Sequence, residues 1–263
     1  MRNIHRAVVG ATAALTVLVP TGMAYASTGT TTPPTPGQTT PSQNSSARWQ
    51  ALHEELLEGL QARVQELGTL TSSVNNAKNL SPQDRTALSG LLSNETSGIT
   101  QLLAQVQGAT PQNTTLAQLA ADGKAMYGDY RVYVVMARQV HLTEAADNQT
   151  TAETRIENNE SKIQAAIAKA GNPPDALQAY NDLVAQTSAA TQATGQANIP
   201  AVIAATPQGW PGDKTTLDSA RSALGQADTD LKAARGDLVT IRNVLTQHDS
   251  SVNPPAGQSA SNG

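Results

Sequence analysis

Residues 217–248 read LDSARSALGQADTDLKAARGDLVTIRNVLTQH, and leucine, isoleucine or alanine returns in them at alternating intervals of three and four residues. This interval averages about 3.5 residues, the period of a coiled-coil seam, whereas a β-strand has a period of two. The seam residues are Leu217, Ala220, Leu224, Ala227, Leu231, Ala234, Leu238, Ile241 and Leu245. The segment therefore predicts a long helix that packs one face against other helices.

A second ladder with the same spacing lies near the middle of the chain. Its members are Met126, Tyr130, Tyr133, Ala137, Val140, Ala145, Gln149, Ala152, Ile156, Asn159, Ile163 and Ala166. Two of them, Gln149 and Asn159, are polar, and a polar residue in a seam specifies helix register at some cost in stability. Both ladders predict helices, so the expected fold class is all-α.

Cap and breaker residues divide the chain into about five expected helices. Ser81-Pro82 is typical of a helix start, and Gly171-Asn-Pro-Pro174 of a helix end. The third helix has weak points at Gly123, at Gly128 and at 147–151, each of which could split it. We expect an elongated, antiparallel, coiled-coil-like bundle with disordered N- and C-terminal tails. The expected helices span residues 46–78, 82–107, 114–170, 174–196 and 217–248.

The N-terminal residues have the three parts of a secretory leader: basic residues, an apolar run, and the small residues of Ala24-Tyr25-Ala26. The next segment is rich in Thr and Pro and has almost nothing to bury, which predicts a disordered linker. We therefore expect a signal peptide at 1–26, a linker at 27–45, a helical domain at 46–249 and a disordered tail at 250–263. The helical domain has possible sub-boundaries near 108–113 and 197–213.

Composition excludes several classes of function. The formal net charge is -4, which argues against nucleic-acid binding because phosphate neutralisation needs clustered Lys and Arg. The chain has no cysteine, so disulfides, thiolate zinc sites and cysteine nucleophiles are all excluded. No stretch after the leader is apolar enough to span a bilayer, so we expect no transmembrane anchor once the leader is removed.

The densest group of polar and aromatic residues lies between positions 126 and 144. We expect it to form either a ligand or partner pocket or a set of interhelical hydrogen bonds and ion pairs that fix helix register. The candidate binding residues are Tyr127, Tyr130, Arg131, Tyr133, Arg138, His141 and Glu144. Trp210, in a turn of Gly and Pro, is a second candidate, either exposed to a partner or folded against the end of the bundle.

Motifs of catalysis and metal binding are not found. His53-Glu54-Glu55 begins like the zinc motif HExxH, but Leu57 stands where the second histidine is needed. The chain has no GxSxG sequence and no glycine-rich phosphate loop. We therefore expect a protein that is not an enzyme and needs no cofactor or metal.

These observations predict a secreted or envelope-associated helical protein that acts by protein–protein contact or as a spacer. Its partner would be another envelope or extracellular protein, or a second copy of itself. One alternative is an extracytoplasmic carrier that binds a small ligand between helices near Tyr127–His141, and a second is an envelope hydrolase. In composition the chain resembles exported proteins of high-GC Gram-positive bacteria, a resemblance that implies no activity.

Overall fold

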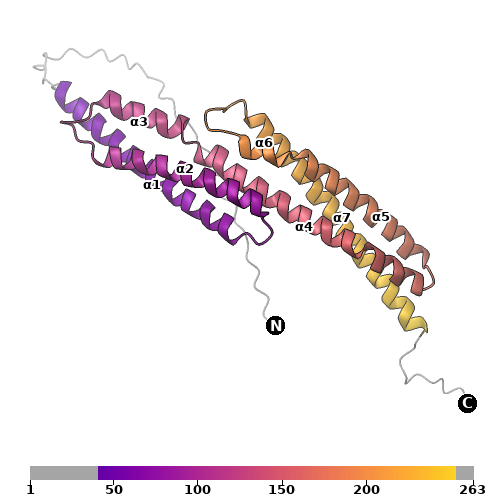
Figure 1. Cartoon of the computed structure of the whole chain (residues 1–263). Helices are drawn as coiled ribbons and strands as arrows, with labels where there is room; N and C mark the ends of the chain where they lie inside the picture. Colours follow the sequence, from indigo (N-terminus) through magenta and orange to yellow (C-terminus); the bar gives the residue numbers. More distant parts are fainter. Residues whose placement is uncertain (1–40, 253–263) are drawn as a thin grey trace, which may run out of the picture. The chain divides into compact units, whose positions relative to one another are not determined.

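The computed structural model describes residues 41–252, and all secondary structure in that range is helical. Five of the helices, α1, α2, α4, α5 and α7, have 23 residues or more (Figure 1). This confirms the expected all-α bundle. The elements are α1 (Pro41–Asn76), α2 (Pro82–Gln107), α3 (Leu116–Gly128), the π-helix η1 (Val132–Met136), α4 (Ala137–Lys169), α5 (Pro174–Gln196), α6 (Ile199–Ala204) and α7 (Lys214–Val252).

The predicted signal peptide, most of the predicted linker and most of the predicted tail lie outside the described residues. The first helix begins at Pro41, so residues 41–45, which we assigned to the linker, are helical. At the other end, α7 continues to Val252, two residues past the expected start of the tail.

Local caps set the helix boundaries much as the sequence predicts. The Ser81 hydroxyl accepts a hydrogen bond from the backbone N–H of Asp84 at 3.1 Å, which begins α2. Thr115 and Gln118 form a reciprocal capping box at the start of α3, one residue later than expected. After α4, Gly171 and Asn172 adopt positive φ angles of 79° and 58° and reverse the chain toward α5.

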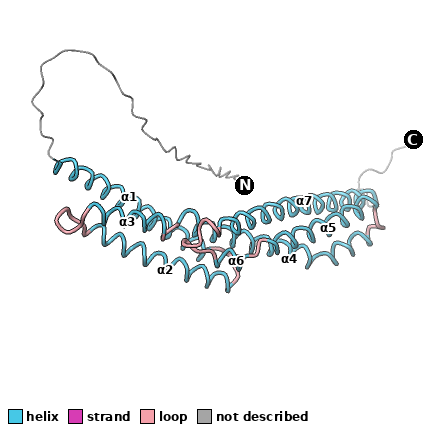
Figure 2. Tube along the Cα trace, turned by 90° about the horizontal axis from the view of Figure 1, so that it is seen from above, coloured by secondary structure: helices cyan, strands magenta, loops and turns pink. Residues whose placement is uncertain are grey.

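The segment expected as one helix from 114 to 170 is divided at Gly128, one of its predicted weak points. The chain leaves α3 there and re-enters a helix through the single π turn of η1 (Figure 2). This break changes the phase of the ladder, so Val132, Val135 and Met136 are buried while Tyr133 is 48% exposed. The expected seam position of Tyr133 was therefore wrong.

The same ladder drifts again along α4. Asn159 and Ala166 are exposed, whereas Glu153 and Ile167 are buried. A straight α-helix has 3.6 residues per turn, so a 3.5-residue ladder rotates by about 20° with each heptad. Asn159 consequently bonds the carbonyl of Arg155 on its own helix and does not specify register.

Apolar side chains form three clusters, and α4 takes part in all of them. One cluster joins α1, α2 and α3 to η1 and the first turn of α4. Another joins the N-terminal third of α4 to α6 and the start of α7, and the third joins its C-terminal half to α5 and the rest of α7. As expected, the first two helices pack on one part of the central segment and the last two on the remainder.

The most extensive contact between two helices is that of α5 with α7, and both helices present small residues to it. The α7 ladder is buried as predicted from Leu217 to Ala234 and at Ile241, while Leu238 and Leu245 are half-buried. Opposite it, α5 buries Ala176, Ala179, Leu183, Thr187, Ala190 and Ala193. Thr187 is tolerated there because its hydroxyl donates to the carbonyl of Leu183 at 2.8 Å.

Candidate functional site

The seven residues proposed as one pocket are distributed over several contacts. Tyr127 and Tyr133 lie near each other because both rings face the guanidinium of Arg63, at 5.0 and 5.5 Å from its central carbon. Arg63 is only 9% exposed, and its Nη1 donates to the carbonyl of Gly59 at 2.8 Å. Sequence reasoning overlooked Arg63, although it occupies a ladder position between the buried Leu60 and Leu67.

Tyr130 is a packing residue. It is half-buried in the break between α3 and η1, where it packs against the cluster formed by α1, α2 and α3. Its ring lies so close to Gly98 of α2 that a Cβ atom at that position would come within 2.5 Å of it. The glycine therefore makes room for the tyrosine at the point where the central segment changes direction.

Arg138 and Glu144 connect α4 to other helices, while the partner of His141 is on α4 itself. Arg138 forms an ion pair with Asp218 of α7, and Lys214 contacts the same carboxylate. Hydrogen bonds from Lys214 and Arg138 lower the pKa of Asp218 to about 2. Glu144 accepts a hydrogen bond from Ser73 of α1 at 2.7 Å, and the exposed His141 lies 4.0 Å from Glu144. These contacts fit the register-fixing interpretation.

Trp210 is half-buried and packs against the cluster around Val202 and Leu217. This fits the interpretation of a turn residue folded against the bundle. Arg131 has a similar connecting role, because its Nε donates to the carbonyl of Pro207 in the same loop, at 3.1 Å. Arg131 also borders a groove, together with Tyr127.

That groove lies between α1 and α3 and has a volume of about 570 Å³. Its lining is mainly apolar, with Lys124 and Arg131 as basic members and Glu55 as the acidic one. We call it the α1/α3 groove. The residues that line it are Leu52, Glu55, Leu56, Ala120, Gly123, Lys124, Tyr127, Gly128 and Arg131.

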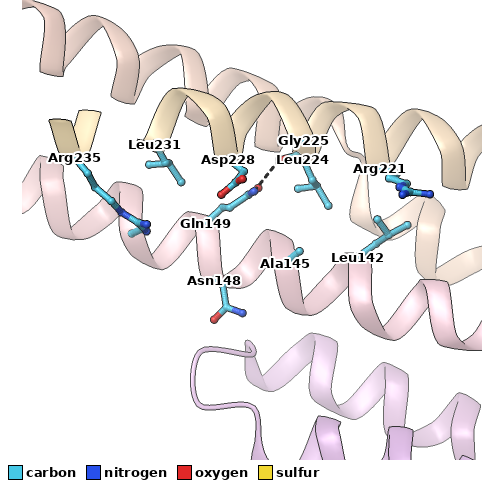
Figure 3. Close-up of a pocket in the computed structure, with 11 residues that line it drawn as sticks. Leu142, Ala145, Asn148, Gln149, Arg221, Leu224, Gly225, Asp228, Leu231 and Arg235 are labelled. Atoms are coloured by element: carbon cyan, nitrogen blue, oxygen red, sulfur yellow. Dashed lines mark hydrogen bonds between the residues drawn. The ribbon is translucent and has the colours of Figure 1, made fainter. Parts of the chain in front are cut away.

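A second groove, of about 430 Å³, runs between α4 and α7 (Figure 3). Figure 3 shows Gln149 reaching from α4 to the carbonyl of Leu224 on α7, and Nε2 lies 2.8 Å from that oxygen. Thr194 of α5 donates to the buried Glu153 of α4 at 2.7 Å. Together with the bond of Gln149, this contact forms a polar layer that connects α4, α5 and α7. The lining residues are Leu142, Ala145, Asn148, Gln149, Ala152, Arg221, Leu224, Gly225, Asp228, Leu231 and Arg235.

A second, separate cavity lies between the same two helices, closer to their C-terminal ends. It has a volume of about 350 Å³ and is lined by Lys162, Ile163, Ala166, Leu238, Ile241, Arg242, Leu245 and Thr246. Arg138 of α4 contacts Asp218 of α7, and the later residue Gln149 of α4 contacts the later residue Leu224 of α7. Residue numbers thus increase in the same direction along both helices, so α4 and α7 run parallel. We call the two cavities together the α4/α7 groove.

Charged residues border the α4/α7 groove at intervals of seven. They are Arg221, Asp228, Arg235 and Arg242, all on α7 and all exposed. Residues seven apart share one stripe of a helix, next to the seam formed by Leu224, Leu231, Leu238 and Leu245. Asp228 forms an ion pair with Lys232, while no ion pair within residues 41–252 involves the three arginines.

The described residues contain no candidate metal centre. Within residues 41–252 no group of three or more His, Asp or Glu could hold a metal ion. His53 lies 2.8 Å from the carbonyl of Val106 and stacks on Trp49, which gives it a structural role. Between Pro41 and Val252 no helix combines the length and apolar character that crossing a bilayer demands.

Glu95 is the most unusual ionisable group. It lies on the inner stripe of α2, between Leu92 and Ile99, and its Oε1 is buried without a hydrogen-bond partner among the described residues. Burial raises the pKa of Glu95 from 4.5 to about 7. A carboxyl in this position therefore retains its proton in the folded protein at a pH where the unfolded chain has lost it.

We expect Glu95→Gln to stabilise the fold at pH 8 and to have little effect at pH 4.5. Because the folded state binds the proton more tightly, wild-type stability falls as pH rises from about 4.5 to about 7. The neutral amide avoids the cost of ionising a buried carboxyl at high pH. We put this cost at about 1 kcal/mol after allowing for the partial exposure of the side chain. Urea unfolding at both pH values measures it, with the exposed Glu54→Gln as control. An equal effect of Glu95→Gln at both pH values would contradict the interpretation.

In comparisons with protein-family models, curated proteins and solved structures, nothing matches this chain. The functional assignment therefore rests on the grooves and their charges.

Proposed function

We propose that the protein is an exported, non-enzymatic helical protein that acts by contact with another protein of the cell envelope or the extracellular space. The leader and the Thr/Pro-rich segment of the sequence support export and display. The α4/α7 groove supports the contact function, and it is the observation on which the proposal depends. Its shape and charge favour a helix as the bound element.

A partner helix fits because the residues that border the groove recur every seven positions, which is the repeat of two helices packed together. Two parallel helices provide an apolar floor, and an amphipathic third helix could lay its own seam into that floor. The stripe from Arg221 to Arg242 spans 21 residues, or roughly 32 Å at about 1.5 Å per residue. A partner helix of similar length would therefore contact every arginine of the stripe.

The charge of the stripe specifies the partner further. Charges that flank a seam select partners by opposite sign, so Arg221, Arg235 and Arg242 favour a helix with Glu or Asp beside its seam. A second copy of α7 fits less well. Parallel pairing would place each arginine against its own copy. Antiparallel pairing that aligns the full stripe would place Arg221 against Arg242 and Arg235 against Asp228, so the like-charge pairs offset the opposite-charge pairs. We therefore assign the groove to a foreign, acidic, amphipathic helix.

Two synthetic 21-residue helical peptides test this assignment. Both carry the same Leu/Ala seam, and the flanking positions are all Glu in one and all Lys in the other. We expect the chain from residue 27 onward to bind the Glu peptide at least about tenfold more tightly at low salt, with the preference weakening as salt is added. Fluorescence anisotropy of labelled peptides gives both dissociation constants.

Reversing the charge of the stripe should reverse the preference. We expect Arg221→Glu with Arg235→Glu to bind the Lys peptide more tightly than the Glu peptide. The matched control is Arg155→Glu with Lys169→Glu, which changes net charge equally on α4 but outside the groove. Failure of both peptides to bind would overturn the helix-docking proposal. A stable dimer by sedimentation, abolished by the Arg221/Arg235 pair and not by the control, would replace the foreign partner with a second copy.

A further inference from the structure

The α1/α3 groove differs from the α4/α7 groove in size, charge and neighbours. It does not continue as a helical stripe, and Gly128 and Arg131 line it where α3 stops. Its volume of about 570 Å³ lies within the range of small-molecule sites, about 300–1,000 Å³. It therefore calls for a separate explanation.

The walls of the groove divide into an apolar part and a basic part. Leu52, Leu56 and Ala120 supply apolar surface, and the Tyr127 ring borders it. Tyr127 is 56% exposed, and its ring packs against the buried guanidinium of Arg63, whose central carbon lies 5.0 Å from the ring centre. A wall that is fixed before a ligand arrives loses little entropy on binding.

Lys124 and Arg131 make the groove basic. Lys124 forms no ion pair within the described part of the chain, and neither does Arg131. The bond from Arg131 Nε to the carbonyl of Pro207 fixes the guanidinium, and no hydrogen bond within residues 41–252 uses its two terminal nitrogens. With Glu55 as the acidic member, the lining carries one more basic than acidic residue.

We propose that the α1/α3 groove binds a small amphiphilic carboxylate. Its apolar body lies against Leu52, Leu56 and the Tyr127 ring, and its carboxylate is held by Lys124 and Arg131. Guanidinium groups bind carboxylates through two parallel hydrogen bonds, and the lysine adds a second positive charge. This binding activity is independent of helix docking at the α4/α7 groove, so each can fail without the other.

Gly128 provides a way to block the groove without disturbing the core. It lines the groove, its φ is not positive, and a Cβ atom added there would meet nothing within 4 Å. A leucine at this position would extend into the space that the ligand needs. Gly90 of α2 also has nothing within 4 Å of an added Cβ and does not line the groove, so Gly90→Leu is the matched control.

Isothermal titration with decanoate and with 1-decanol, on the chain from residue 27 onward, tests the proposal. We expect decanoate to bind at least about tenfold more tightly than decanol, Gly128→Leu to abolish that binding, and Gly90→Leu to leave it unchanged. Lys124→Gln with Arg131→Gln should remove the preference for the carboxylate while decanol still binds. Circular dichroism confirms that each variant is folded.

Three results would overturn the proposal: no binding of decanoate, equal binding of decanoate and decanol, or full binding by a folded Gly128→Leu variant.

Discussion

Replacing Leu231 by alanine should lower the free energy of unfolding by about 2–5 kcal/mol, the range for emptying a packed leucine site. Leu231 is 2% exposed and belongs to the cluster that α7 forms with α5 and the C-terminal half of α4. That cluster is rich in alanine, which has no side chain long enough to fill the space of a missing leucine. Thermal or urea unfolding followed by circular dichroism measures the loss.

Leu238→Ala is the matched control, since it removes the same atoms from the same ladder one heptad later. Leu238 is half-buried, so part of its surface faces water in the folded state already. We therefore expect it to cost clearly less than Leu231→Ala. Equal losses at the two positions would mean that the seam does not become more open toward the end of α7.

Gln139→Leu should destabilise the fold by about 2–3 kcal/mol, although leucine is apolar and close to glutamine in size. Gln139 is fully buried in α4, and its Nε2 lies 3.0 Å from the carbonyl oxygen of Val202, 2.9 Å from that of Ile203 and 2.8 Å from that of Ala205. The carbonyls of Ile203 and Ala205 lie at the end of α6, where no further helical N–H follows to bond them, whereas the carbonyl of Val202 also accepts from the backbone N–H of Ala205 at 3.2 Å. A leucine leaves the carbonyls of Ile203 and Ala205 without this donor, and each unsatisfied group costs about 1–3 kcal/mol. It also removes Gln139 Oε1, a buried atom with no hydrogen-bond partner among the described residues, and this gain offsets part of the loss.

The control for this substitution is Gln164→Leu, an exposed position on the same helix. We expect it to change stability by less than about 0.5 kcal/mol, as surface substitutions usually do. Urea unfolding of both variants decides the question. A Gln139→Leu variant as stable as Gln164→Leu would show that α6 does not depend on this side chain.

Much of the fold could be predicted from the sequence because it depends on neighbouring residues. The ladder of α7, the cap at Ser81 and the chain reversal after α4 all follow from spacing and local hydrogen bonding within a few positions. The break at Gly128 was predicted as one of several weak points. The sequence did not predict the change of ladder phase that follows the break. A break of a few residues is enough to turn every later side chain to a different face of the helix.

The candidate site was predicted less well. The segment around residues 126–144 does hold Tyr127 and Arg131, which share the α1/α3 groove. Arg138 and Glu144 instead bond to α7 and α1. Arg63 and Glu95 could have been recognised from the sequence. Each occupies a position where the spacing of three and four residues between buried apolar side chains predicts another apolar residue.

Sequence alone determined that this chain is helical, where the caps that begin α2 and follow α4 lie, and which face of α7 is buried, because those features depend on periodicity and caps within one segment. Tertiary structure alone decided that Arg63 holds Tyr127, that Gln139 bonds the end of α6, and that α4 and α7 enclose a groove lined with arginines. Such contacts join residues more than sixty positions apart, and which of them meet depends on how whole helices pack.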